Sequence, residues 1–221
     1  MNHPLPHPLE GMFFDLDGTL VDSAPDLHDA LAAVCGERGI EAPAYETVRA
    51  VTSRGARAIV STAFGDQGEN VVDAVLPRFL ELYADTGTVR THPFAGIEAL
   101  LCKLEARGIR WGVITNKAGF LAAPLMERLG YAARSSALVA GDTLPVRKPH
   151  PDPVLLACRQ AGVDPARCAF VGDDPRDVQA GQAAGLHTIV AGWGYLDSQD
   201  ARGWGAEAYA DDAEQITGWL D

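Results

Sequence analysis

Short apolar runs of β type alternate with segments of helical periodicity along most of the 221-residue chain. This alternation is typical of a parallel sheet covered by helices on both faces, because each parallel strand needs a crossover to reach the next. Right-handed crossovers place the carboxyl ends of all strands at one edge of the sheet. The predicted strands span residues 12–14, 110–115, 137–139, 168–171, 187–191 and 208–210. The sequence therefore predicts an α/β fold with a doubly wound, Rossmann-like parallel sheet.

The alternation stops after the first predicted strand. From residue 24 onward, apolar residues recur at helical spacing, as in Leu27, Leu31 and Val34, and no strand pattern appears through residue 90. We therefore expect residues 24–91 to form a separate helical cap, hinged near 22–24 and 91–96. The core would then comprise residues 11–23 and 92–221, preceded by a flexible, proline-rich tail over residues 1–10.

Composition and charge restrict the partners. The formal net charge of −12 argues against nucleic acid or an anionic membrane as a partner. The first residues lack the basic and long apolar regions of a signal peptide or a membrane anchor. The cysteines have no CxxC spacing, so we expect buried, reduced thiols in a cytoplasmic protein. These four residues are Cys35, Cys102, Cys158 and Cys168.

Asp15 and Asp17 stand directly after the first predicted strand and are followed by Gly18. Carboxylates at the carboxyl end of a parallel strand can meet a divalent cation and a substrate in the crevice outside the sheet. Gly18 allows the chain to turn at once, so both acids can converge on one point. One acid could attack a substrate while the other transfers protons.

Three further groups follow other predicted strands. Thr115-Asn116-Lys117 offers a hydroxyl and backbone N–H groups for a phosphate, although Thr-Asn at this position is commonly a helix cap. Lys148 stands beside Pro149, a pairing that is usually found at the surface. The acidic run Gly172-Asp173-Asp174-Pro175-Arg176-Asp177 would repel itself unless a cation binds it or it caps a helix. Asp174 before a proline indicates a cap, which leaves Asp173 and Asp177 for the site.

In this order, the four motifs resemble those of the haloacid dehalogenase-like hydrolases that carry a helical cap after the first motif. The resemblance covers the chain beyond its first ten residues. Within the family the chain is similar to phosphoglycolate phosphatases and to the N-acetylmuramic acid 6-phosphate phosphatase branch. The second likeness depends on residues 53–58 of the cap and on residues 111–117.

The resemblance implies a Mg²⁺-dependent phosphate monoester hydrolase that acts through an aspartyl phosphate. Asp15 would be the nucleophile and Asp17 the general acid and base. Mg²⁺ would be held by Asp15, the backbone carbonyl of Asp17 and Asp173. Lys148 would neutralise charge on Asp15 and on the phosphoryl group. Thr115 and Asn116 would bind the phosphate.

The remaining roles stay open at this point. Asp177 would orient Lys148 or a metal-bound water without touching the ion, or would simply stabilise a helix N-terminus. Arg54 and Arg57 of the cap would bind the anionic remainder of the substrate, or would be solvated on a helix surface. Lys117 could face the substrate or water. The loop at Trp193 and Tyr195 could line the mouth of the site or pack in the interior.

Several rival functions remain. A phosphoryl mutase similar to β-phosphoglucomutase would share all four motifs, and free phosphate release would distinguish a phosphatase from it. A hydrolytic dehalogenase has no need for Asp17. A receiver-type signalling domain carries its phosphoacceptor on a middle strand and has no large helical insertion. A non-catalytic phosphate-binding module would be expected to lack Asp15 or Asp17, and both are present.

Overall fold

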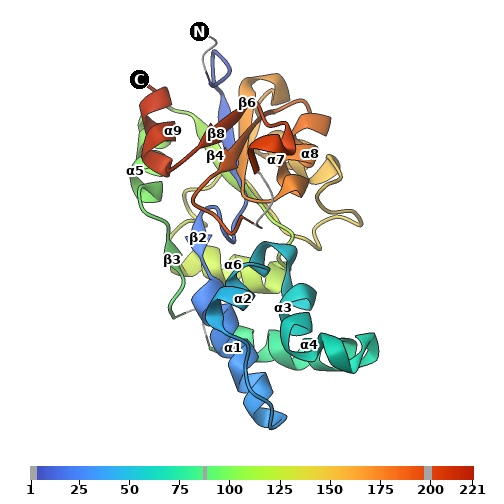
Figure 1. The fold of residues 1–221 in the computed structure, drawn as a ribbon. Coiled ribbons are helices and arrows are strands. Elements are labelled where there is room, and N and C mark those ends of the chain that lie inside the picture. The colour runs from blue at the N-terminus through green and yellow to red at the C-terminus, as the bar shows by residue number, and fades with distance from the viewer. Residues whose placement is uncertain (1–3, 87–88, 197–200) are drawn as a thin grey trace.

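The computed structural model describes residues 4–86, 89–196 and 201–221 and contains an α/β core with a separate helical cap below it (Figure 1). The core sheet is parallel, with the strand order β5-β4-β1-β6-β7-β8. Its strands are β1 Gly11–Phe14, β4 Arg110–Ile114, β5 Leu138–Val139, β6 Cys168–Gly172, β7 His187–Ala191 and β8 Ala208–Ala210. The predicted fold class is confirmed, and every predicted strand is present within one residue of its expected bounds.

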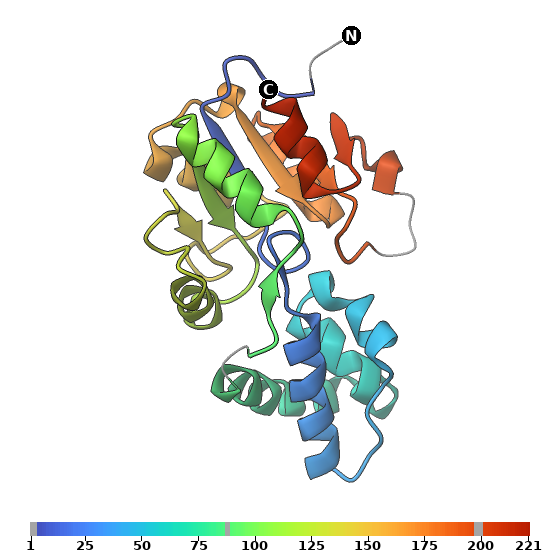
Figure 2. The same cartoon turned by 90° about the vertical axis from the view of Figure 1, so that its left-hand side faces the viewer.

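Helices cover both faces of this sheet. In Figure 2, α5 and α9 lie over one face. The core helices are α5 Ile97–Ala106, α6 Gly119–Arg128, α7 Asp152–Ala161, α8 Pro175–Ala183 and α9 Ala213–Trp219, with the 3₁₀ turns η3 Pro165–Arg167 and η4 Ala201–Trp204. Successive residues of β1 point to opposite faces: Met12 and Phe14 pack with Leu101, whereas Phe13 packs with Val154. Burial on both faces explains why this strand is a continuous apolar run.

The cap has an apolar core of its own. It contains α1 Ala24–Glu37, α2 Tyr45–Arg49, α3 Ala56–Phe64 and α4 Glu69–Asp85, with the 3₁₀ turns η1 Thr52–Arg54 and η2 Gly65–Gln67. Leu31, Ile59, Val75 and Phe79 are buried among these helices, and Leu121 of α6 joins the same cluster from the core side. The cap is therefore a packed unit that rests on α6.

Two short segments join the cap to the core. Strand β2 (Val21–Asp22) pairs antiparallel with β3 (His92–Pro93), and the pair crosses between the two units (Figure 1). The carboxylate of Asp26 accepts hydrogen bonds from the backbone N–H groups of Arg90 (2.9 Å) and Thr91 (2.6 Å), which holds the outgoing segment against α1. The sequence did not predict this ribbon, because two-residue strands are too short to show a period.

Two expectations differ from the structure. Leu5 is only 4% exposed and packs in the core, and Glu10 N–H donates to Arg167 O at 2.8 Å, so the expected tail contacts the core at these two residues, whereas His7 and Pro8 between them are exposed. Residues 1–3 of the expected tail lie outside the described residues. Cys35, Cys158 and Cys168 are buried, but Cys102 is exposed on α5, so the prediction of burial was wrong there. In the described part of the chain, no helix combines the length and the apolar character that a bilayer crossing requires.

We expect Phe79→Ala to lower the free energy of unfolding by about 3–5 kcal/mol, because the side chain is fully buried and its loss leaves a cavity in the cap. Phe120→Ala is the matched control: that side chain is 58% exposed, and its loss should cost no more than about 0.5 kcal/mol. Urea unfolding curves measure both values. Equal losses in the two variants would show that the cap core does not contribute as described.

Candidate active site

The predicted motifs meet at the carboxyl ends of three neighbouring strands. In the sheet, β1 lies between β4 and β6, and Phe14, the last residue of β1, is in register with Val113 and Val171. The residues that follow these strands therefore emerge side by side although they are distant in the sequence. Above them, a cavity of about 370 Å³ extends between core and cap, and Asp15, Asp17, Thr115 and Asn116 line its core side.

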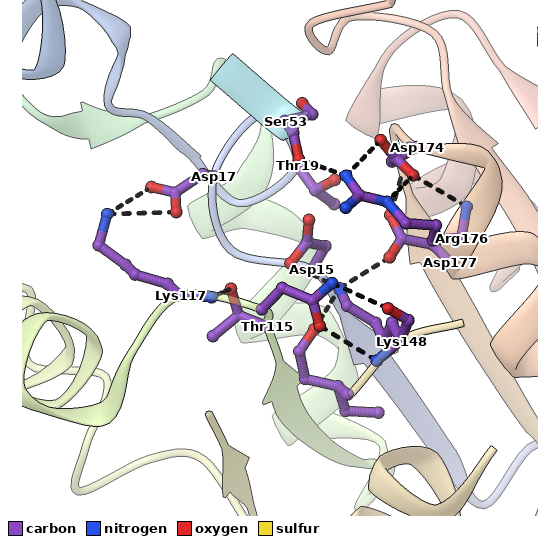
Figure 3. A network of polar contacts seen from close by, with 12 residues as sticks. Asp15, Asp17, Thr19, Ser53, Thr115, Lys117, Lys148, Asp174, Arg176 and Asp177 are labelled. Carbon is purple, nitrogen blue, oxygen red and sulfur yellow. Dashed lines mark hydrogen bonds and ion pairs between the residues drawn. The ribbon is translucent and has the colours of Figure 1, made fainter. Parts of the chain in front are cut away.

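Lys148 lies among buried acids at the base of the site (Figure 3). Its Nζ is 2.8 Å from Asp15 Oδ1 and 2.7 Å from Asp177 Oδ1, and it donates to Ile114 O at 2.7 Å. Burial disfavours the charged form of this lysine, but the two neighbouring carboxylates outweigh burial and raise the pKa of Lys148. The side chain is therefore a buried ammonium that faces the expected nucleophile.

Asp15, Asp173 and Asp177 place one carboxylate oxygen each within 4.8 Å of one another, and all three are buried. One ammonium cannot neutralise three carboxylates at this distance. Burial, followed by the charge of Asp15, raises the pKa of Asp173 to about 7. Asp15 Oδ1 has Lys148 beside it but no hydrogen bond of regular geometry within the described residues. A buried, all-oxygen set with excess negative charge fits a hard divalent cation such as Mg²⁺.

Asp173 is also in contact with the cap. Its Oδ1 accepts from Thr19 Oγ1 at 3.0 Å, and its Oδ2 accepts from Ser53 Oγ of the cap at 2.7 Å and from Tyr195 N–H at 2.9 Å. Gly18 has a φ of +86°, and a Cβ at this position would overlap the Asp173 carboxylate, so only glycine allows the close approach. Sequence reasoning gave no function to Thr19 or Ser53, although both lie in segments that carry the family resemblance, because a hydroxyl residue does not by itself show which group it binds.

The start of α8 combines a structural and an electrostatic function. Asp174 is the N-cap, accepting from Arg176 N–H at 2.9 Å, and Asp177 Oδ2 accepts from Asp174 N–H at 3.2 Å, which completes a capping box. Asp177 thus stabilises the helix N-terminus and faces Lys148 with its other oxygen. The guanidinium of Arg176 binds Asp174 and donates to the backbone oxygen of Ser53 at 2.6 Å, which joins α8 to the cap.

The second motif holds two neighbouring loops in place. The amide of Asn116 donates to Lys148 O at 3.0 Å and accepts from Lys148 N–H at 3.1 Å, so it fixes the lysine loop. Thr115 Oγ1 accepts from Lys117 N–H at 3.1 Å. The Asp17 carboxylate lies apart from the acidic group: it accepts from Ser23 Oγ at 2.5 Å and from Lys117 Nζ at 3.0 Å (Figure 3). Lys117, which sequence reasoning left open, therefore faces Asp17.

Three arginines that bear on the substrate question line the cavity: Arg54, Arg57 and Arg147. Arg57 is engaged on the cap surface, where it contacts Asp73 and binds Glu69 at 2.7 Å. Arg147 stands in the third motif, Arg147-Lys148-Pro149, but the sequence gave it no role, and within the described residues its guanidinium has no ion pair. Its only sequence signal is its position directly before Lys148.

The loop after β7 packs against the core, and its Tyr195 lines a hollow of about 230 Å³ beside Ser53 and Asp173. Trp193 Nε1 donates to Thr19 O at 2.9 Å. The Tyr195 hydroxyl accepts from the backbone N–H groups of Ser23 (2.7 Å) and Ala24 (2.9 Å) and donates to Asp22 Oδ1 at 2.6 Å. Tyr195 therefore anchors the first residues of the cap to the core, next to β2.

A family model of haloacid dehalogenase-like hydrolases matches residues 12–191. The parallel sheet, the buried aspartate directly after β1 and the buried lysine beside it agree with that match. The chain belongs to the haloacid dehalogenase-like hydrolase family.

Relatives that are named phosphatases match the chain over nearly its whole length. The chain is 42% identical over 217 residues to the N-acetylmuramic acid 6-phosphate phosphatase of Pseudomonas aeruginosa, covering 96% of this chain and 95% of the relative. It is 39% identical to the phosphoglycolate phosphatase of Xanthomonas campestris pv. campestris, covering 93% of both chains. The crystal structure of a predicted phosphoglycolate phosphatase from Haemophilus somnus 129PT has the same fold, with a TM-score of 0.86 at 24% identity, over 96% of this chain and 98% of that one.

The pKa of Asp173 gives a prediction for the metal-free protein. A carboxyl group whose pKa is raised from 3.8 to about 7 on folding contributes stability that is present at low pH and is lost as the pH rises through that range. In the presence of a chelator, we therefore expect Asp173→Asn to have a higher urea midpoint of unfolding than the wild type. The difference between the two midpoints should grow from pH 5 to pH 8. The exposed control Asp66→Asn should show no such growth. An advantage of Asp173→Asn that is independent of pH would contradict this account.

Proposed function

We propose that this protein hydrolyses the phosphate monoester of a small carboxylated metabolite, through an aspartyl phosphate on Asp15 and with Mg²⁺ as cofactor. The observation that carries the proposal is the buried Asp15 carboxylate, which lies 2.8 Å from the Lys148 ammonium at the base of a cavity between core and cap. A carboxylate is a competent nucleophile without prior deprotonation near neutral pH. Lys148 removes the charge repulsion that an incoming phosphoryl group would otherwise meet.

In the first step, an Asp15 oxygen attacks phosphorus, the bond from phosphorus to the ester oxygen breaks, and Asp17 gives a proton to the departing alkoxide. In the second step, water attacks the aspartyl phosphate, Asp17 takes a proton from that water, and inorganic phosphate and free Asp15 result. Asp15, Asp173 and the backbone carbonyl of Asp17 would hold Mg²⁺, which when bound offsets the charge of the phosphoryl oxygens. Thr115 and Asn116 would position the phosphoryl group.

The volume and the apolar lining of the cavity favour N-acetylmuramic acid 6-phosphate, the larger of the two candidate esters. The named relatives act on phosphoglycolate and on N-acetylmuramic acid 6-phosphate, both of which carry a carboxylate besides the phosphate. Phosphoglycolate offers a single methylene group to an apolar wall, whereas the sugar offers the methyl groups of its acetyl and lactyl substituents. That wall is formed by Leu27, Ile59, Leu76, Leu80 and Leu121. A volume of about 370 Å³ also lies in the range of pockets for ligands of sugar size.

A cationic group at the cavity would bind the substrate carboxylate. Arg147 supports this role better than Arg57, because Arg57 already binds two carboxylates of the cap. Arg54 lines the cavity from the cap and would act with Arg147. The four free thiols fit a reducing compartment, and the proposal places the reaction in the cytoplasm.

Asp15→Asn should abolish turnover of every ester in a panel of phosphoglycolate, sugar 6-phosphates and N-acetylmuramic acid 6-phosphate assayed with Mg²⁺. The amide keeps the shape of the side chain but is not a nucleophile. Release of inorganic phosphate is the measurement, and wild-type protein must release it for the proposal to stand. Phosphoryl isomers without free phosphate would instead show a mutase, and undiminished hydrolysis by the variant would exclude Asp15 as the nucleophile.

Arg147→Gln should lower kcat/KM for N-acetylmuramic acid 6-phosphate by about 10-fold or more, since it removes a charge-assisted hydrogen bond to the carboxylate. N-acetylglucosamine 6-phosphate lacks the lactyl carboxylate, and its kcat/KM should not change. Arg57→Gln is the matched control and should have a smaller effect on the carboxylated ester. A loss of the same size on both sugars would assign Arg147 to the phosphoryl group or to folding.

A further inference from the structure

We infer that the loop Trp193-Gly194-Tyr195, which follows β7, is a positioning element for the metal ion and sets where the Asp173 carboxylate lies relative to the turn after Asp15. This inference rests on the Mg²⁺ site that is part of the proposed function. The loop belongs to none of the four motifs, and β7 is separated from β1 by β6 in the sheet. Its residues nevertheless contact the segments after both β1 and β6, which supply the expected metal ligands.

Gly194 brings this loop into direct contact with both segments. A Cβ at Gly194 would overlap the Cβ of Asp173 and the backbone oxygen of Gly18. A Cβ at Gly18 would in turn overlap the Asp173 carboxylate. The Asp173 side chain therefore lies against the backbones of two glycines from separate segments. Because neither glycine carries a side chain, the turn after Asp15 and the carboxylate of Asp173 can approach each other closely.

Hydrogen bonds from three segments fix the direction of the carboxylate. Tyr195 N–H (2.9 Å) and Ser53 Oγ (2.7 Å) donate to Asp173 Oδ2, and Thr19 Oγ1 donates to Oδ1 at 3.0 Å. Trp193 Nε1 donates to Thr19 O at 2.9 Å, so the loop also holds the residue that binds Oδ1. A carboxylate accepts about four hydrogen bonds. With these bonds from the described residues in place, Asp173 can offer a cation one lone pair, on Oδ1.

A fixed carboxylate suits a cation that needs precise coordination. Mg²⁺ requires near-octahedral geometry with short distances to oxygen, so it binds poorly to a ligand that is displaced. Asp15, Asp173 and Asp177 place their oxygens within 4.8 Å of one another only while Asp173 keeps its place. Groups that hold a metal-binding side chain in position typically contribute about 10- to 100-fold to metal affinity. The loop thus acts on the metal through Asp173, without contact to the ion.

Gly194→Ala tests the inference, and Gly192→Ala is the matched control two residues earlier. A Cβ at Gly192 would overlap the backbone oxygen of Ala210 and the ring of Tyr209, both in β8, and would not meet Asp173. Neither glycine has a positive φ, so the backbone itself strains an alanine at neither position. Both substitutions force atoms apart and should lower the urea midpoint of unfolding. Only Gly194→Ala should displace the metal-binding carboxylate.

Titration calorimetry with MgCl₂, without any ester, measures the Kd for Mg²⁺. The Kd of Gly194→Ala should exceed that of the wild type by about 100-fold. The Kd of Gly192→Ala should change by less than about 3-fold, because its collision lies away from Asp173. Trp193→Phe keeps a ring in place and removes the Nε1 donor to Thr19 O, and its Kd should rise by about 10-fold. If Gly194→Ala does not fold, Trp193→Phe decides the inference.

An unchanged Kd in the folded variants of Gly194 or Trp193 would overturn the inference. An equal loss of affinity in Gly192→Ala would also overturn it, since the loop would then only stabilise the fold. A wild type that binds no Mg²⁺ would refute the inference together with the assigned cofactor. A wild type that binds Mg²⁺ but releases no phosphate from the ester panel would refute the proposed function alone, and the effect of the loop on the Kd would stand.

Discussion

The structure depends on the concentration of like charge that a parallel sheet produces at its carboxyl edge. Three carboxylates, from Asp15 after β1, Asp173 after β6 and Asp177 in the first turn of α8, are buried within a few ångströms of one another, and a single ammonium from Lys148 faces this group. Such a group is unfavourable without a partner, because burial and mutual repulsion both penalise ionised carboxyls. The remaining elements hold this group together: the glycine turn after Asp17, the capping box of α8 and the amide clamp of Asn116.

The same charge excess connects the core to the cap. Asp173 accepts a hydrogen bond from Ser53, and Arg176 donates to the backbone oxygen of the same residue, so one contact of the cap with the core lies directly on the acidic group. On the opposite side of the cavity, Lys117 joins Asp17 to Tyr83. Cap position is therefore fixed by polar contacts to groups that also take part in the proposed chemistry, and the apolar contact at Leu121 adds affinity without direction.

Much of this arrangement could be predicted from the sequence, for identifiable reasons. The strands of the core are buried on both faces, so their apolar runs are visible, and the motif residues other than Lys148 follow them directly. Asp15 and Asp173 could be expected at the same edge because right-handed crossovers bring the carboxyl ends of all strands together, and the family resemblance placed Lys148 beside them. The β2–β3 ribbon, the hydroxyls of Thr19 and Ser53, and the pairing of Lys117 with Tyr83 could not be predicted. Each of these features depends on how the cap packs against the core, and neither residue spacing nor composition indicates that packing. Cys102 shows the converse limit, since a helical pattern alone did not reveal which face of α5 is covered.

The two connecting segments leave and re-enter the core side by side, as the paired strands β2 and β3. An insertion attached at a single point of the scaffold can be exchanged for one of different size without altering the register of any core strand. The length of the cap and its number of helices can therefore change while the site in the core stays the same. Proteins that share this core can acquire new substrates through exchange of the cap, without changes to the residues at the carboxyl ends of the core strands.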